Sequence, residues 1–158
     1  MLHGDTSVLE AGRTEITLLD QDATALAHAH DRIHALAAEA GIEVTLRCLR
    51  TSIKTVIAEG PDGSYDLIYS AGLFDYLGDR TVRRAGARLV AALAQGGSAV
   101  IGNFNVANPT RPFMELLLDW PLHHRTPTEL LDLFGDLGSR VTVEQETTGI
   151  NLFAVIDA

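Results

Sequence analysis

The densest cluster of polar and aromatic side chains lies in the segment from Asp119 to Arg125, DWPLHHR. An arginine such as Arg125 can hold a carboxylate through paired hydrogen bonds, and a histidine such as His123 or His124 can act as a general base. The alternative is a loop before a helix with solvated histidines, which the residue types alone favour. The segment therefore predicts either a small-molecule site or a solvated loop.

A second group of candidate residues follows two apolar runs. Residues 67–69 and 99–102 flank a helical pattern, which predicts a strand, a helix and a parallel strand. Ligands of open α/β sheets bind beyond the carboxyl ends of the strands. We therefore expect a site built from residues 70–80 and 103–111, the first of which contains Asp75 and Tyr76. Tyr76 could equally cover the core.

The chain before these runs predicts a further strand and helix. Residues 15–20, EITLLD, form an apolar run that ends in Asp20. Asp22 is a typical N-cap for a helix that reaches about Ala40 and stops at Gly41. The helical spacing predicts a buried stripe of Leu26, Ala29, Ile33, Leu36, Ala37 and Ala40.

The remaining elements complete an α/β pattern. An amphipathic helix is predicted from the helical spacing of Val82, Ala85, Leu89, Val90 and Leu93, and Gly96-Gly97 should form a tight turn. Pro109 and Pro112 should keep the following segment non-helical at its start. The capping box Thr126–Glu129 predicts a helix that ends at Gly138. We also expect strands at 42–48, 140–147 and 150–156, a short helix at 52–59, and an antiparallel hairpin from the last two strands.

Composition limits the functions that the chain can have. With 158 residues and 46% hydrophobic content, we expect an arm of residues 1–13 and one domain of residues 14–158. The net charge of −9 argues against nucleic-acid binding, and no apolar run is long enough for a membrane span. The single Cys48, expected to be buried and inert, fits a reducing cytoplasm. His30 and His34 have the spacing of metal ligands but lack a third ligand, so we predict no metal site.

The ordered set of motifs resembles class I S-adenosylmethionine-dependent methyltransferases. The motifs are the strand ending in Asp20, the strand YDLIY, the Gly96-Gly97 turn and the final hairpin. More narrowly, YDLIYSAGLFDYL, IGNF and DWPLHHRT resemble bacterial methyltransferases of the extracellular-factor type, which make 3-hydroxypalmitate methyl ester. The resemblance covers about residues 14–158 and implies a Rossmann-like, mainly parallel sheet with helices on both faces.

The resemblance also implies roles for the candidate residues. Asp20 would hold the ribose hydroxyls of S-adenosyl-L-methionine and Gln21 would lie beside the adenine, while Ser70, Ala71 and Gly72 would complete the cofactor site. Without the resemblance, Asp20 could equally end its strand and cap a helix. Asp75, Tyr76 and His124 would be catalytic. The residues expected to bind the small, acyl or carboxylate-bearing acceptor are Asn103, Trp120, His123 and Arg125.

One part of the family pattern is missing from this sequence. The family has a first strand and a glycine-rich loop upstream of the strand equivalent to residues 15–20, and about 14 residues precede that strand here. We expect a truncated or degenerate relative with an open sheet edge. Residues 5–11 could fill the gap, the gap could close directly, or a second chain could cover it, and a homodimer is expected. The functional alternatives are a methyltransferase and a non-catalytic module that dimerises through that edge.

Overall fold

The computed structural model describes residues 14–158, so the expected arm and its pairing into the sheet lie outside the described residues. The chain divides into two compact units, and the boundary between them in the sequence lies between Thr55 and Val56. Each unit is described by itself. No helix in the described part of the chain is long and apolar enough to cross a membrane.

The first unit is a strand, a helix and a second strand. β1 (Thr14–Asp20) pairs in parallel with β2 (Val44–Arg50), and α1 (Ala23–Ala40) connects them. Asp22 accepts hydrogen bonds from the backbone of Thr24 and Ala25, and Gly41 ends the helix in the left-handed conformation at φ 67°. The predicted cap, helix and stop are confirmed, and the second strand begins two residues later than expected.

Burial in the first unit is shallower than the pattern predicted. Leu26 is the buried residue of α1, and Ala29, Ile33 and Ala37 are half-buried, but Leu36 and Ala40 are exposed. The prediction that Cys48 is buried is wrong, because its side chain is exposed. β2 has β1 as its neighbour in a two-stranded sheet, and so small a sheet covers few of its own side chains.

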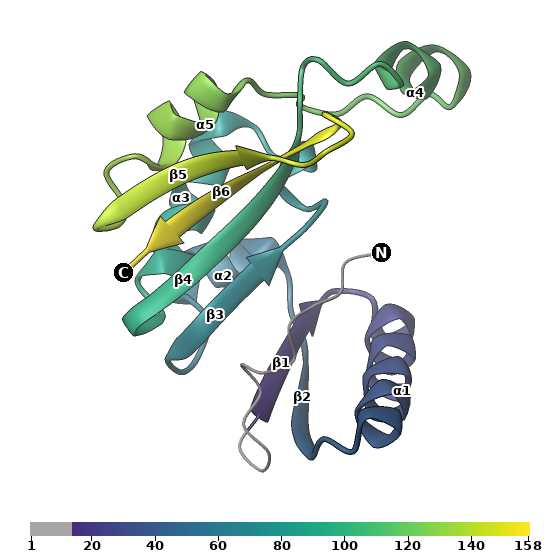
Figure 1. The fold of residues 1–158 in the computed structure, drawn as a ribbon, viewed down its shortest axis with the longest axis vertical. Coiled ribbons are helices and arrows are strands. Elements are labelled where there is room, and N and C mark those ends of the chain that lie inside the picture. Colours follow the sequence, from purple (N-terminus) through teal and green to yellow (C-terminus); the bar gives the residue numbers. More distant parts are fainter. Residues whose placement is uncertain (1–13) are drawn as a thin grey trace. The chain divides into compact units, whose positions relative to one another are not determined.

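The second unit contains a four-stranded sheet in the order β3-β4-β6-β5 (Figure 1). β3 (Tyr65–Ser70) runs parallel to β4 (Leu93–Phe104), and β6 (Asn151–Asp157) runs antiparallel to both β4 and β5 (Arg140–Gln145). The predicted parallel crossover and final hairpin are confirmed. The helical elements are α2 (Ile53–Glu59), which begins at the end of the first unit, the 3₁₀ turn η2 (Phe74–Tyr76), α3 (Asp79–Val90), α4 (Arg111–Leu117) and α5 (Pro127–Phe134).

The core of the second unit lies between one face of the sheet and the helices α3 and α5 (Figure 1). Phe74 and Phe134 meet edge to face, with ring centroids 6.2 Å apart. On the opposite face, Leu67 and Tyr69 of β3 are exposed. The fully buried apolar side chains of the second unit are Phe74, Val82, Ala85, Ala99, Ile101, Leu130, Phe134, Leu152, Ala154 and Ile156.

The predicted turn at Gly96-Gly97 is instead an irregularity inside β4. The strand starts at Leu93, which was expected to belong to the helix, and its register against β3 shifts between Tyr65 and Leu67. Gly96 has a φ of 79°, and a Cβ on Gly97 would lie 2.8 Å from the carbonyl oxygen of Tyr65. The two glycines therefore let the strand bulge without breaking its pairing.

Two helix boundaries also differ from the expectation. Pro112 lies in the first turn of α4, where its missing N–H costs no helical hydrogen bond. The predicted capping box of Thr126 and Glu129 is confirmed, but α5 ends at Phe134 instead of Leu137. The N–H of Gly135 closes the helix on Leu131.

The described strands form two separate sheets, one in each unit. Among the described residues, β1 has only β2 as a neighbour and β3 has only β4. The three possible repairs of the gap, by residues 5–11, by direct closure or by a second chain, stay predictions.

Candidate functional site

The carboxyl end of β3 leads into a short exposed loop and then into η2. Ser70 is half-buried at the end of the strand, Ala71 and Gly72 are exposed, and Gly72 has a φ of 77°. A Cβ at Gly72 would meet no atom within 4 Å. The glycine thus supplies the turn that brings the chain from the sheet to Asp75 and Tyr76.

Arg125 joins the loops at the strand ends. Arg125 is 3% exposed, and its guanidinium donates hydrogen bonds to the carbonyl oxygens of Phe74 (3.1 Å) and Leu77 (2.6 Å) and to Oδ1 of Asn103 (2.5 Å). It also pairs with the exposed carboxylate of Asp79 at 2.9 Å. All three guanidinium nitrogens are thus engaged within the chain, in place of the acceptor carboxylate that we expected.

Asn103 is the second buried part of this network. It lies near the end of β4 at 1% exposure, and its Nδ2 donates to the carbonyl oxygens of Phe104 (3.0 Å) and His123 (2.9 Å). With Arg125 on its Oδ1, the amide is bonded at both ends. Asn103 therefore fixes the loop around His123 against β4 and offers little to a ligand.

Asp75 is buried in η2 and bonded to the end of β4. Its Oδ1 accepts a hydrogen bond from the N–H of Phe104 at 2.6 Å, and its carbonyl oxygen accepts one from the N–H of His123 at 2.8 Å. Burial raises the pKa of its carboxyl from the ordinary value of 3.8, against the opposing effects of the Phe104 N–H, His124 and Arg125.

The raised pKa of Asp75 makes the stability of the folded chain depend on pH in one direction. Because the folded chain holds this proton more tightly than the unfolded chain, the stabilising contribution is complete below the unfolded pKa, about 3.8. It is lost as the pH rises through the higher folded pKa.

His124 is half-buried and held on three sides. Its ring stacks on Phe104 at 5.5 Å between centroids, its Nδ1 lies 3.2 Å from the carbonyl oxygen of Leu122, and its Nε2 lies 3.5 Å from Nδ2 of Asn108. The neutral tautomer with a proton on Nδ1 satisfies both contacts. His124 thus has both nitrogens engaged, whereas His123 is exposed.

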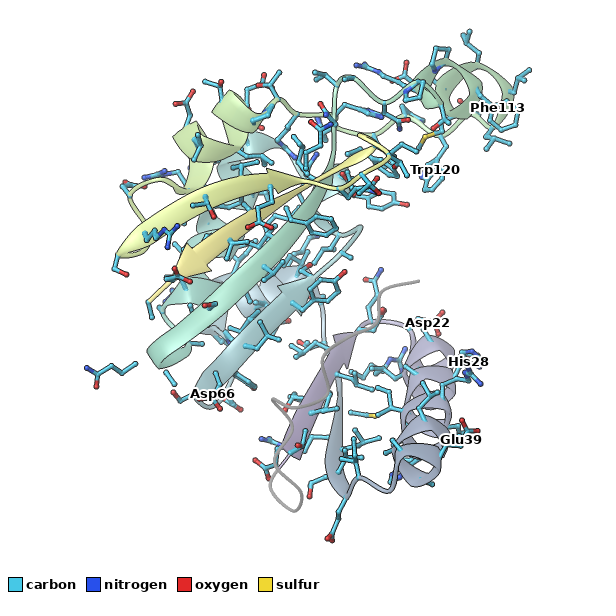
Figure 2. The ribbon with its side chains drawn as sticks, viewed as in Figure 1. Asp22, His28, Glu39, Asp66, Phe113 and Trp120 are labelled. Atoms are coloured by element: carbon cyan, nitrogen blue, oxygen red, sulfur yellow. The ribbon has the colours of Figure 1, made fainter. Side chains whose placement is uncertain are left out.

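Tyr76 and Trp120, which the sequence placed 44 positions apart, meet in the structure. Nε1 of Trp120 donates to the hydroxyl oxygen of Tyr76 at 3.0 Å. Asp119, in the left-handed region at φ 48°, turns the chain after α4 so that Trp120 reaches this position (Figure 2). Because Tyr76 accepts this bond, its own O–H stays available to another oxygen.

Sequence reasoning missed two residues of this site, Phe104 and Asn108. Asn108 is 3% exposed, and its Oδ1 accepts hydrogen bonds from the backbone N–H and the hydroxyl of Thr110. The Asn108-Pro109 dipeptide was the available signal, since it favours the start of a turn. No comparable signal marked Phe104 as the platform for His124.

In the first unit, Asp20 and Gln21 follow the end of β1 and are exposed. Oδ1 of Asp20 accepts a hydrogen bond from the N–H of Asp22 at 2.9 Å, and Arg50 donates to the carbonyl oxygen of Gln21 at 3.1 Å. The described residues place no hydrogen-bond partner on the second carboxylate oxygen of Asp20. No group of three metal-ligating side chains occurs among the described residues.

The chain is similar to solved structures of methyltransferases. A putative O-methyltransferase from Nostoc punctiforme PCC 73102 matches with a TM-score of 0.68 and 18% identity, over 91% of this chain and 45% of that one. Magnesium protoporphyrin IX methyltransferase from Synechocystis PCC 6803, solved with bound S-adenosylhomocysteine, matches at 0.63 and 9% identity, over 89% and 62%. The chain has part of a methyltransferase fold. The predicted α/β, Rossmann-like fold class is confirmed.

The chain is also similar to a solved structure of another description. A possible exported protein from Bordetella parapertussis matches with a TM-score of 0.71 and 22% identity, over 90% of this chain and 53% of that one. The chain spans about half the length of these two proteins, 53% of the Bordetella protein and 45% of the Nostoc protein. No protein-family model and no curated protein matches it.

Proposed function

We propose that this chain binds S-adenosyl-L-methionine and takes part in methyl transfer to an oxygen of a small acceptor. The observation that carries the proposal is the similarity to methyltransferases over about nine-tenths of the chain. Two of the similar structures hold S-adenosylhomocysteine, the product of such a transfer. The acceptor that we favour is an acyl or carboxylate-bearing molecule, in line with the extracellular-factor type, and the lone cysteine leads us to propose a cytoplasmic location.

The residues at the end of β1 fit the ribose of the cofactor. A carboxylate binds a vicinal diol well because each oxygen accepts hydrogen bonds, and Asp20 is exposed with one oxygen not engaged by the described residues. Its other oxygen is held by the N–H of Asp22, which fixes the carboxylate in place.

The cofactor supplies the methyl group, and the chain's own residues would position the acceptor and manage its proton. Tyr76 and Trp120 are exposed and bonded to each other, so we assign them direct contact with the acceptor. His123 is also exposed, and we assign it the role of proton acceptor.

The buried members of the network act through these residues. Asp75, Asn103 and Arg125 are at most 3% exposed, so we assign them the task of holding the loops that carry Tyr76 and His123. This assignment revises the acceptor-binding role that the sequence suggested for Asn103 and Arg125. His124, with both nitrogens engaged, supports the same loop.

The second candidate function is a non-catalytic module that forms homodimers through its open sheet edge. The observation that favours it is β3, which has one neighbouring strand among the described residues and exposes Leu67 and Tyr69 at 62% and 63%. Free edge strands are usually protected by lysine, proline or a bulge at the edge. β3 contains neither lysine nor proline.

The test is transfer of a labelled methyl group from S-adenosyl-L-methionine to a panel of hydroxy acids, fatty acids and hydroxy-acyl esters. We expect transfer to at least one of them, and Tyr76→Phe should lower the rate about tenfold or more if the hydroxyl meets the acceptor. Tyr65→Phe is the matched control, because Tyr65 bonds to the carbonyl oxygen of Asp62 away from these loops. Equal rates for the two variants would remove Tyr76 from the site.

A further inference from the structure

The exposed apolar side chains of α4 and the turn after it form one stripe. Phe113, Leu116 and Leu117 are 55%, 82% and 73% exposed, and Trp120 is 39% exposed. Phe113, Leu116 and Leu117 are spaced i, i+3 and i+4, the pattern with which an amphipathic helix buries one face, and Trp120 follows after the turn at Asp119. We call these four residues the α4 stripe.

The residues that the structure describes leave Phe113, Leu116 and Leu117 of the α4 stripe largely uncovered. The buried residue of α4 is Met114, through which the helix contacts its own unit. Figure 2 shows α4 and Phe113 standing clear of the four-stranded sheet. The apolar pattern of the helix is therefore turned outward.

The apolar surface of the stripe is large enough to matter for association. Together with the neighbouring Leu118, 53% exposed, it amounts to about three whole apolar side chains, or roughly 500 Å². Each partner in an interface of standard size contributes about 800 Å². The stripe would thus supply more than half of one side of such an interface.

The charges around the stripe favour a second copy of this chain over an anionic membrane. Arg111 is paired with Glu115 at 2.8 Å, the stripe contains no lysine, and the chain carries a net charge of −9. Adsorption to anionic lipid depends on a basic polar face, which this segment lacks.

A two-fold pairing also matches the ends of the segment. In an antiparallel arrangement, Arg111 at the start of one helix would lie near Asp119 at the end of the other, while the apolar residues meet at the centre. We propose that the α4 stripe is the surface through which two copies of this chain form a two-fold dimer. The proposal does not depend on methyl transfer.

The dimer can be tested by sedimentation of the full chain over roughly 1–300 µM. We expect a reversible monomer–dimer equilibrium, and the double variant Leu116→Glu, Leu117→Glu should weaken the dimer at least about 100-fold, because charges would replace apolar contacts. Leu131→Glu, at another exposed leucine of the second unit, should leave the dimer unchanged. Tyr69→Glu tests the rival contact at the β3 edge.

Two results would overturn the proposal. One is a wild-type chain that stays monomeric up to 300 µM, and the other is a dimer that Tyr69→Glu disrupts and the α4 double variant leaves intact.

A crosslink gives a second readout that does not depend on how the glutamate variants fold. Leu117 lies close to the middle of the stripe, so a two-fold axis would bring both copies of this position within disulfide reach. In a Cys48→Ser background, Leu117→Cys should form a covalent dimer under mild oxidation, and Arg84→Cys on α3 should not. Equal crosslinking of both variants, or of neither, would contradict the α4 contact.

Discussion

Replacing Arg125 with alanine should destabilise the second unit by about 3–5 kcal/mol. The buried guanidinium donates to two carbonyl oxygens, of Phe74 and Leu77, and to the side chain of Asn103. Hydrogen bonds to a charged group contribute about 1.5–3 kcal/mol each, and water entering the vacated space would recover part of that sum. The ion pair with Asp79 adds under about 1 kcal/mol, because that carboxylate is largely in solvent.

The assay is urea denaturation followed by the fluorescence of Trp120, the sole tryptophan, which reports on the second unit. Arg125→Lys keeps the charge but lacks the planar fork, so it should recover only part of the loss. Asp79→Ala should cost under about 1 kcal/mol. Because Asn103 and Arg125 share one network, the double alanine variant should lose less than the sum of the single losses.

Either of two results would contradict the claim that the hydrogen bonds of Arg125 and Asn103 support these loops. One is a loss below 1 kcal/mol for Arg125→Ala, well under the loss that three buried hydrogen bonds imply. The other is full additivity between Arg125→Ala and Asn103→Ala.

Three further predictions concern single contacts. Asp75→Asn keeps an acceptor for the Phe104 N–H but cannot titrate. The stability of the wild type relative to this variant should therefore fall as the pH rises from about 4 towards neutrality. A flat or rising difference in stability would contradict the raised pKa of Asp75. Tyr76→Phe removes the acceptor of the Trp120 N–H and should shift the tryptophan emission, whereas an unchanged spectrum would mean that the pair does not form in solution. Asp22→Ala should lower stability in the first unit by about 1 kcal/mol, measured by circular dichroism, and no loss would show that the cap is dispensable.

Local patterns in the sequence predicted the elements that depend on local physics. The Asp22 cap, the Gly41 stop and the Thr126–Glu129 capping box each involve residues within a few positions, and all three are observed. The failure at Gly96-Gly97 has a different origin. Glycine indicates unusual φ values, but the pairing with β3 decides whether the chain turns or bulges, and that pairing is not local.

The sequence predicted which segments meet at the strand ends of the second unit better than it predicted which of their side chains are buried. Residues 70–76 and 119–125 do come together at the strand ends of the second unit, as the contacts of Arg125 and the pair of Tyr76 with Trp120 show. Polar residue types could not reveal which of them are buried. Arg125 has the chemistry of a carboxylate ligand, but three partners from distant parts of the chain enclose it.

Calorimetric titration with S-adenosylhomocysteine tests the central claim, that this chain keeps a cofactor site, most directly. We expect binding with a dissociation constant in the micromolar range, lost in Asp20→Ala and retained in Asp22→Ala, because only Asp20 can offer a carboxylate oxygen to the ribose in the arrangement that we propose. No heat of binding at millimolar ligand from a well-folded chain would contradict the claim and leave the non-catalytic module as the better account.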